Sequence, residues 1–247
     1  MRRLVKSLRK RWRRRFGRPS PKALWVRQVR ECQQILAESD PNPHYLTAYR
    51  QHEMSYWEHI ARWIHELRGT GRVERCLDIG CAYGTLALFC RRVLGCEVYC
   101  TDFTDSFFTQ SVGREYGLVF ARNNIESDPF AWAQRFDLII FTEVLEHLNL
   151  HPVPTLTKIR ELLTERGRVY LSTPDASEWG RVTKYYESYA DMPYERGSVP
   201  LIDDHVYHYS KGELAELFAA AGLAIERLAY APGAGWRHFN LALRRQA

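Results

Sequence analysis

The sequence lacks an uninterrupted apolar run of about 18 residues, the length that a helix needs to cross a bilayer. Its start also lacks the apolar core of a secretory signal, because Arg and Lys interrupt it every few positions. We therefore expect neither a membrane-spanning nor a secreted protein, but a cytoplasmic one. With 247 residues, of which 45% are hydrophobic, the chain has the size of one globular domain with a helical appendage.

The cysteines include no CxxC pair and no spacing typical of a zinc site or a disulfide framework. Most of them fall within segments that we interpret as buried strands and helices. We therefore expect free core thiols in a reducing compartment. The cysteines stand at positions 32, 76, 81, 90, 96 and 100.

Acidic residues are absent from residues 1–22, which hold eleven of the 35 Lys and Arg of the chain. Residues 23–247 contain the other 24 basic residues and all 29 acidic residues, so this part has a net charge of −5. The formal charge of +6 for the whole chain thus comes from its first residues. This balance argues against a nucleic-acid-binding surface on the folded body, and we expect no nucleic-acid partner.

Residues 1–20 form a basic segment with an ordered apolar pattern. Leu4, Leu8, Trp12 and Phe16 recur every four residues, which places them on one face of a helix. A cationic helix with such a stripe is typical of peripheral contact with an anionic membrane surface, here the inner face of the membrane. A solvated basic arm, a mitochondrial transit peptide and a nucleic-acid arm are the alternatives.

Residues 21–70 are predicted to form a helical extension packed on the rest of the chain. We expect one helix at 21–39 and a second at 44–68, each with an apolar stripe at helical spacing. "DPNP" separates the two helices. The first stripe consists of Trp25, Val29, Cys32 and Leu36, and the second of Trp57, Ile60, Ala61, Ile64 and Leu67.

Residues 71–247 alternate between strand and helix patterns, which is typical of a doubly wound parallel sheet. "FDLIIF" is apolar on both faces, as a buried parallel strand must be. Two final strands without a helix between them predict a C-terminal antiparallel hairpin. The expected fold class is α/β, with a Rossmann-like, mostly parallel sheet. The expected strands are 73–78, 96–101, 117–121, 136–142 and 167–173, and the expected helices 83–94, 104–116, 153–165 and 210–221.

The stretch 174–209 is too long for a simple connection and is rich in tyrosine. It follows the fifth strand, so we expect it over the carboxyl ends of the strands, where ligands bind in this architecture. We interpret it as a substrate cap. Its last part, "LIDDHVYHY", concentrates two acids and two histidines.

The segment "CLDIGCAYGTLAL" leads from an apolar strand through an acid and a tight turn into a helix. This arrangement is typical of sites that bind nucleotide-like ligands. It departs from the dinucleotide pattern G-x-G-x-x-G, because Thr85 stands at the third glycine position. The acid, Asp78, suits a ligand with a cationic amino group, although it could also bind backbone donors. The binding candidates in this turn are Asp78, Gly80, Cys81, Tyr83 and Gly84.

The ends of the next two strands supply further candidates. Asp102 ends the second strand, where a carboxylate can accept both hydroxyls of a ribose. Phe103 beside it could cover an adenine face. Asn124 and Ile125 follow the third strand and could meet the adenine edge. In the alternative interpretation, Asp102 only caps the following helix.

Taken together, these motifs resemble the class I S-adenosylmethionine-dependent methyltransferase family. "LDIGCAYG" is similar to its first motif, "TDF" to its second-strand acid and "FDLIIFTEVLEHL" to its fourth strand and following loop. "DDHVYHYSKGELAELFAAAGL" resembles one branch, many of whose members modify bacterial surface glycans, natural products or quinones. Ala82 departs from the family's commoner glycine. The resemblance covers about residues 73–245 and implies S-adenosylmethionine as cofactor and 71–247 as the methyltransferase domain.

The same resemblance adds Glu143, after the fourth strand, to the cofactor-binding candidates. An oxygen acceptor also needs a base, and the ordinary pKa of histidine suits that task. We interpret His147 and His205 as the catalytic candidates, although the "EHL" of the family could instead shape the pocket. Asp175 and His208 are the other candidates for the base.

We expect the enzyme to methylate a hydroxyl of a membrane-associated or lipid-linked glycan, because the cap is aromatic and the first residues suit a membrane. A prenylated quinone or phenolic precursor and a small natural product stay open as acceptors. We expect no metal, although Asp203, Asp204 and a histidine could hold one. A catalytically silent scaffold and an RNA-binding module are the alternatives from other classes; the intact binding motifs and the charge balance argue against them.

Overall fold

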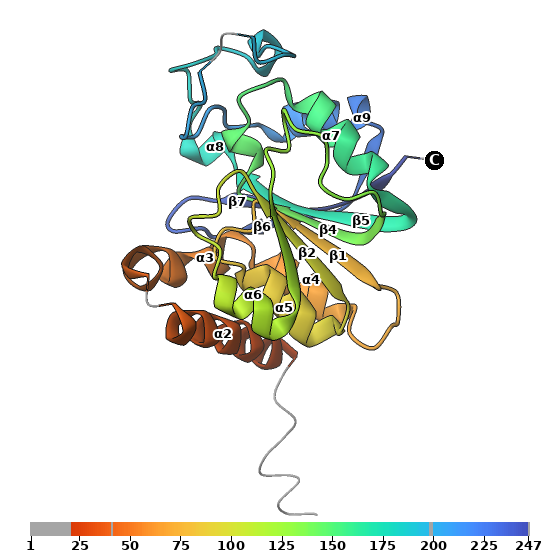
Figure 1. Cartoon of the computed structure of the whole chain (residues 1–247). Helices are drawn as coiled ribbons and strands as arrows, with labels where there is room; N and C mark the ends of the chain where they lie inside the picture. The colour runs from red at the N-terminus through yellow and green to blue at the C-terminus, as the bar shows by residue number, and fades with distance from the viewer. Residues whose placement is uncertain (1–20, 41, 198–199, 247) are drawn as a thin grey trace, which may run out of the picture.

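A seven-stranded sheet forms the centre of the computed structural model (Figure 1). The strand order is β3-β2-β1-β4-β5-β7-β6; β1 to β5 run parallel, and β7 is antiparallel to both of its neighbours. This confirms the predicted fold class and its C-terminal antiparallel pair. The strands are β1 (Arg75–Ile79), β2 (Glu97–Asp102), β3 (Leu118–Arg122), β4 (Phe136–Thr142), β5 (Leu163–Pro174), β6 (Leu223–Ala231) and β7 (His238–Arg245).

The structure describes residues 21–40, 42–197 and 200–246. The predicted amphipathic segment 1–20 lies outside the described residues. Among the helices that are described, none combines the length and the apolar character needed to cross a membrane.

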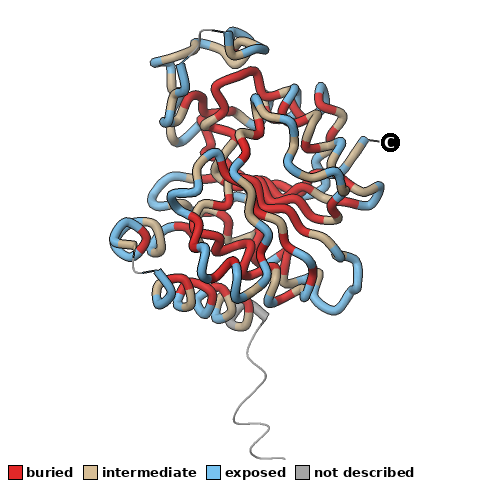
Figure 2. Tube along the Cα trace, in the orientation of Figure 1, coloured by how far each residue is buried: buried red, intermediate tan, exposed pale blue. Residues whose placement is uncertain are grey.

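The sheet has a hydrophobic cluster on each face, and its central strands are buried on both (Figure 2). In β4, Leu138 and Ile140 belong to one cluster, whereas Ile139 and Phe141 belong to the other. Successive side chains of a strand point to opposite faces, so the structure confirms the interpretation of "FDLIIF". The first face carries α2 (Pro21–Ser39), α4 (Glu58–Glu66), α5 (Thr85–Leu94) and α6 (Gln110–Tyr116); the second carries α7 (Pro152–Glu161) and α9 (Lys211–Ala220).

The N-terminal extension shares the cluster of the first face, where α2 buries its predicted apolar stripe. The prediction of one helix over 44–68 is wrong. A π-helix (Tyr45–Tyr49), α3 (Arg50–Tyr56) and α4 replace it, with a break at Trp57. Asn240 of β7 donates from Nδ2 to the Tyr56 carbonyl (2.7 Å) and accepts from the His59 amide (3.1 Å). A side chain far along the sequence therefore satisfies the backbone at this break.

Two other predicted helices have different ends. The helix expected at 104–116 begins only at Gln110, because the side chains of Asp102 and Thr104 accept hydrogen bonds from nearby amides and hold the preceding residues in a loop. The helix expected to continue to 165 ends at Glu161, because β5 begins at Leu163 and pairs with β4 there. The described cysteines are all free and buried, as expected.

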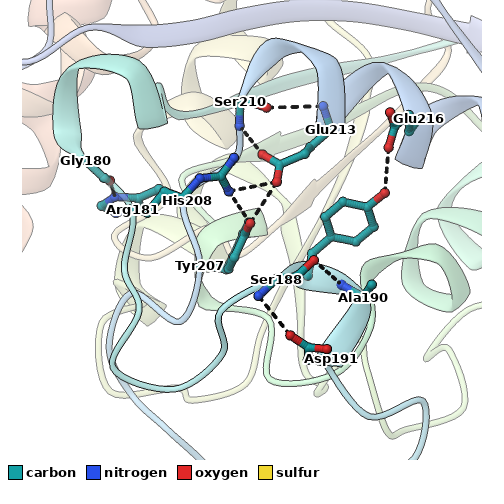
Figure 3. Close-up of polar contacts among 11 residues, drawn as sticks. Gly180, Arg181, Ser188, Ala190, Asp191, Tyr207, His208, Ser210, Glu213 and Glu216 are labelled. Carbon is teal, nitrogen blue, oxygen red and sulfur yellow. Dashed lines mark hydrogen bonds and ion pairs between the residues drawn. The ribbon is translucent and has the colours of Figure 1, made fainter.

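The cap over 174–209 is fastened to α9 (Figure 3). The Tyr207 hydroxyl donates to Glu213 Oε1 (2.8 Å), and Arg181 Nη1 lies 2.7 Å from the same oxygen. Partial burial opposes ionisation of Glu213, but the hydrogen bonds from Arg181 and Ser210 hold its pKa at about 2. Tyr189 adds a hydrogen bond to α9. The cap contains α8 (Ala176–Trp179) and a 3-10 helix (Tyr189–Asp191).

Candidate functional site

A cavity of about 390 Å³ opens at the carboxyl ends of the parallel strands. β1 and β4 are neighbours although β2 and β3 lie on the other side of β1, so the strand order reverses here. Ligands bind at such a switch point in doubly wound sheets. The candidates that line the cavity are Gly80, Asp102, Phe103, Asn124, Ile125, Glu143, His147 and His205.

The turn after β1 brings backbone close to the cavity. Gly80 has φ +71°, a conformation that favours glycine, and a Cβ there would lie 2.2 Å from Val144 Cγ2. Ala82, at the position where the resembled family commonly has glycine, also has a positive φ of 45°. Its amide donates to Asp102 Oδ2 (3.0 Å). The first turn and the second-strand acid are therefore linked directly.

Asp102 is nearly buried at the cavity wall. Its Oδ1 accepts from the Thr104 amide (3.3 Å), and burial raises the pKa of its carboxyl. The carboxylate thus binds a loop amide and lines the cavity; the alternative that it caps the following helix is wrong, because the N-cap of α6 is Thr109. Phe103 beside it is 45% exposed at the rim, and Asn124 and Ile125 lie across the same cavity.

The remaining candidates of the first motif do not line the cavity. Asp78 and Cys81 are buried beneath it, and Gly84 has φ +85° at the start of α5. The Tyr83 hydroxyl bonds to His44 Nδ1 (2.8 Å), and its ring packs on Tyr45 (centroids 4.7 Å apart). Their predicted cofactor contacts stay predictions, and the structure gives Tyr83 a role in holding the extension.

Asp78 carries a buried carboxylate oxygen, Oδ2, without a hydrogen-bond partner. Burial, together with the charge of Asp102, raises the pKa of Asp78 to about 8, and a hydrogen bond from the Ala87 amide partly offsets this. A cationic amino group of a ligand bound at the turn could donate a hydrogen bond to this free oxygen and stabilise the carboxylate form.

Glu143 follows β4 with a positive φ of 54°, which few residues other than glycine adopt. Its Oε1 accepts from the Ser172 hydroxyl (2.6 Å), and its Oε2 lies 2.9 Å from His238 Nδ1. Neighbouring strands β5 and β7 therefore fix this side chain in the cavity wall. Backbone strain of this kind is concentrated at functional sites.

Glu146 is a site residue that the sequence analysis missed. Its side chain is fully buried yet lines the cavity, and Oε2 accepts from the Thr173 hydroxyl (2.9 Å). Oε1 has no partner. Burial, followed by the charge of Glu143, raises the pKa of Glu146 well above its ordinary value. Its place three residues after Glu143 in "EVLEH" was the available signal.

The structure brings the two catalytic candidates together. The rings of His147 and His205 meet edge to face, with centroids 4.7 Å apart. His147 Nδ1 donates to the Asp204 carbonyl (2.9 Å), which leaves Nε2 with a lone pair. Burial, followed by the charges of His147 and His208, lowers the pKa of His205 to about 4. His205 is therefore neutral at physiological pH.

A short hydrogen-bond chain orients His205. His208 Nδ1 donates to the Gly180 carbonyl (2.9 Å), as Figure 3 shows, so its Nε2 accepts from His205 Nδ1 (2.7 Å). His205 Nε2 is left with the lone pair. His208, predicted as an alternative base, thus supports His205. Asp175, the other alternative, caps α8 and pairs with Arg237 (2.6 Å).

One group of potential metal ligands stands out among the described residues. Glu146, His147 and His205 each offer an atom within 4.8 Å of the other two. The predicted alternative set was different: Asp204 bonds to the His205 amide and to Tyr185, and it does not belong to this group. The expectation of no metal was based on the interpretation of the Asp203–His205 segment as a solvated acidic loop, which did not consider Glu146.

The predicted cap supplies further wall residues, and the extension and β7, which no sequence motif marked, supply others. Tyr49 and Tyr56 reach the cavity from the extension, Trp179 from the cap and His238 from β7. Trp179 lies edge to face with His238 (5.4 Å), and Tyr56 packs on that histidine (4.8 Å). They form an aromatic wall beside Glu143.

The chain belongs to the methyltransferase domain family, which it matches over residues 48–228. The fold and this match confirm the predicted enzyme class, a methyltransferase that uses S-adenosylmethionine. The match begins within the extension, before the predicted domain start at residue 71. No curated protein matches the chain in sequence.

Several solved structures share the fold. The 1,6-didemethyltoxoflavin N1-methyltransferase of Burkholderia thailandensis, bound to 1,6-didemethyltoxoflavin and S-adenosylhomocysteine, has a TM-score of 0.60 at 19% identity over 86% of this chain and 88% of its own. The magnesium protoporphyrin IX methyltransferase of Synechocystis PCC 6803, bound to S-adenosylhomocysteine, has a TM-score of 0.56 at 14% identity over 80% and 87%. An S-adenosylmethionine-dependent methyltransferase of Mesorhizobium loti has 0.57 at 15% over 77% and 98%.

Proposed function

We propose that the protein transfers the methyl group of S-adenosylmethionine to a hydroxyl of a membrane-associated or lipid-linked glycan. One observation carries the proposal of oxygen as acceptor: the same cavity is lined by the candidate cofactor residues and by His147 and His205, whose ring centroids lie 4.7 Å apart. A hydroxyl attacks poorly while it is protonated, so a nearby neutral imidazole or its equivalent is required.

The cavity fits the cofactor. Gly80 lies so close to Val144 that only backbone fits at the turn, which leaves this part of the wall free of side chains. Asp102, on the same wall, has a carboxylate that can accept hydrogen bonds from ribose hydroxyls. The orphaned Oδ2 of Asp78 is a partner for a cationic group. When bound, the cofactor supplies an activated methyl group, and orientation of donor and acceptor can lower the barrier by roughly 7–11 kcal/mol at best.

The aromatic side chains of the cavity wall are the basis for the proposed class of acceptor. Tyr56 and Trp179 offer flat faces on which a pyranose can stack. The second candidate is a prenylated quinone precursor or other phenol, which the same aromatic wall favours. Two of the proteins with this fold have planar heteroaromatic compounds in their names, toxoflavin and a porphyrin.

The cofactor assignment is tested with Asp102→Ala. We expect calorimetric titration to detect S-adenosylmethionine and S-adenosylhomocysteine binding to the wild type, weakened about tenfold or more in the variant because the ribose loses its carboxylate. NAD should not bind. Asp105→Ala, which removes an exposed acid from the same loop, is the matched control. If the wild type binds neither compound, the silent-scaffold alternative replaces the enzyme.

The acceptor itself is identified by product analysis. Polyprenyl-linked glycans and prenylated catechols are supplied with isotopically labelled cofactor, and the labelled atom is located by mass spectrometry and NMR. Label on a glycan oxygen supports the proposal. Label on a phenolic oxygen supports the second candidate, and label on nitrogen or carbon rejects both.

Membrane contact is proposed for residues 1–20. We expect the full chain to pellet with anionic vesicles and a chain starting at residue 21 to remain in the supernatant, because the remaining body is net acidic. The control Leu8→Ser/Trp12→Ser keeps every charge. Retained pelleting of that control would identify a purely electrostatic arm, and pelleting of the shortened chain would place the contact elsewhere. Affinity for S-adenosylhomocysteine should not change with any of these.

A further inference from the structure

Glu146, His147 and His205 converge on one point of the cavity wall from two separate segments. Glu146 and His147 lie in the 3-10 helix after β4 (Leu145–His147), and His205 lies in the cap. The segments are held together by backbone: the Glu146 carbonyl accepts from the amides of Val206 (2.7 Å) and Tyr207 (3.2 Å). The group is therefore positioned by fixed structure.

An unsatisfied carboxylate oxygen points to a missing partner. Glu146 is 0% exposed; Oε2 accepts from the Thr173 hydroxyl, Oε1 has no donor among the described residues, and the Glu143 carboxyl is its nearest charged neighbour there, so two acidic groups share this wall without a facing cation. A buried carboxylate oxygen without a donor destabilises the folded protein unless a cation or donor faces it. Two imidazole nitrogens with lone pairs lie nearby. One ligand atom of each of the three side chains lies within 4.8 Å of the other two, so a single cation can bind all three.

The outer hydrogen bonds prepare both imidazoles as ligands. His147 donates its Nδ1 proton to the Asp204 carbonyl, and His205 donates its Nδ1 proton to His208. Each histidine thus keeps its Nε2 lone pair. Metal-binding histidines almost always donate their second ring N–H to such a partner, which fixes the ring and its tautomer.

We propose that Glu146, His147 and His205 bind a divalent first-row transition metal ion, with open coordination positions facing the cavity. Two imidazoles and one carboxylate suit zinc, iron, cobalt or manganese better than magnesium or calcium. Resting on the proposed oxygen acceptor, the ion would replace a free imidazole base, because it takes up both Nε2 lone pairs: it would bind the acceptor hydroxyl and ease loss of its proton to water. The oxygen then bonds to the methyl carbon, and the electron pair of the broken carbon–sulfur bond stays on sulfur.

Metal binding is tested on the full chain after treatment with a chelator. Titration with Co²⁺, followed by calorimetry and visible absorption, should show one ion per chain. We expect Glu146→Gln and His205→Asn to weaken binding at least tenfold and to change the absorption bands. His147→Asn, at a half-buried position, serves as a third variant in case Glu146→Gln does not fold, as judged by thermal unfolding.

The controls separate this site from other ligands. His52→Asn removes an exposed histidine and should bind Co²⁺ as the wild type does. His208→Phe removes the hydrogen bonds of His208 to His205 and Gly180 but no ligand, and should weaken binding less than any of the ligand variants does. The proposal is overturned if the wild type binds no stoichiometric ion, or if the ligand variants bind Co²⁺ unchanged.

A separate measurement distinguishes this proposal from the proposed function. Binding of S-adenosylhomocysteine is measured in the same samples with and without Co²⁺. Intact cofactor binding without metal binding rejects the metal site and leaves the methyltransferase assignment. Metal binding combined with methylation of nitrogen or carbon keeps the site and rejects the oxygen acceptor.

Discussion

Replacing Gly80 with alanine is expected to reduce affinity for S-adenosylhomocysteine by about 100-fold or more, measured by calorimetry. A new Cβ would lie 2.2 Å from Val144 Cγ2, so either the turn or Val144 must move. Val144 stands between Glu143 and the 3-10 helix of Glu146 and His147, and a shift there displaces both walls of the cavity. Overpacking of this kind also lowers the free energy of unfolding by about 1–3 kcal/mol.

Two variants show whether the steric clash is the cause. Gly69→Ala has the same left-handed backbone, with φ +73° against +71°, but no atom within 4 Å of the new Cβ. It should lose about 1 kcal/mol of stability and no ligand affinity. Adding Val144→Ala to Gly80→Ala removes the clashing methyl and should recover much of the affinity. If the double variant is as weak as Gly80→Ala, backbone strain at the turn is responsible instead.

Much of the fold was predictable because its signals are local. A strand buried on both faces requires a continuous apolar run, so β4 was predicted with its observed ends at Phe136 and Thr142. The glycine turn after β1 and the acid at the end of β2 follow from backbone chemistry within a few residues. These signals located one wall of the cavity, the wall to which we assign the cofactor under the proposed function.

The failures have a common physical origin in contacts between distant segments. The break at Trp57 depends on Asn240, a residue of the last strand. Tyr49 and Tyr56, which line the cavity, come before that break in the chain. No periodicity within the extension could reveal a partner so far along the chain.

The acid–histidine side of the site was predicted in part. His147 and His205 were selected for their ordinary pKa, and the structure does bring them together. Glu146 was missed because a carboxylate in a short loop usually faces solvent. Its burial depends on Thr173 of β5 and on backbone pairing with the cap. The two histidines could therefore be predicted as site residues, but the buried carboxyl of Glu146 beside them could not.

Asp78→Asn is expected to remove a pH dependence of stability and to weaken cofactor binding at least tenfold. The folded-state pKa of Asp78, about 8, lies above its ordinary value of 3.8. Between these values the folded protein binds more protons than the unfolded chain, so the free energy of unfolding falls as pH rises from about 4 to 8. Denaturant unfolding at several pH values should show this slope in the wild type and a flatter one in Asp78→Asn.

The affinity for the cofactor should also depend on the ionisation of Asp78, but it should rise with pH where the stability falls. A cationic amino group near Oδ2 favours the carboxylate, so binding at pH 7 should release a proton and affinity should rise toward pH 8. Calorimetry in two buffers of different ionisation enthalpy measures that proton. Asp105→Asn, at an exposed position, should release the same proton as the wild type.

The outcome decides between the two roles that the sequence left open for Asp78. If Asp78→Asn loses affinity and the proton release disappears, the buried carboxyl is a binding partner held ready at an energetic cost to the empty protein. If affinity is unchanged while the stability slope flattens, Asp78 is a structural acid bound to the Ala87 amide. In that case the cofactor amino group is held by other atoms of the turn, and Asp102 remains the side chain on which recognition depends.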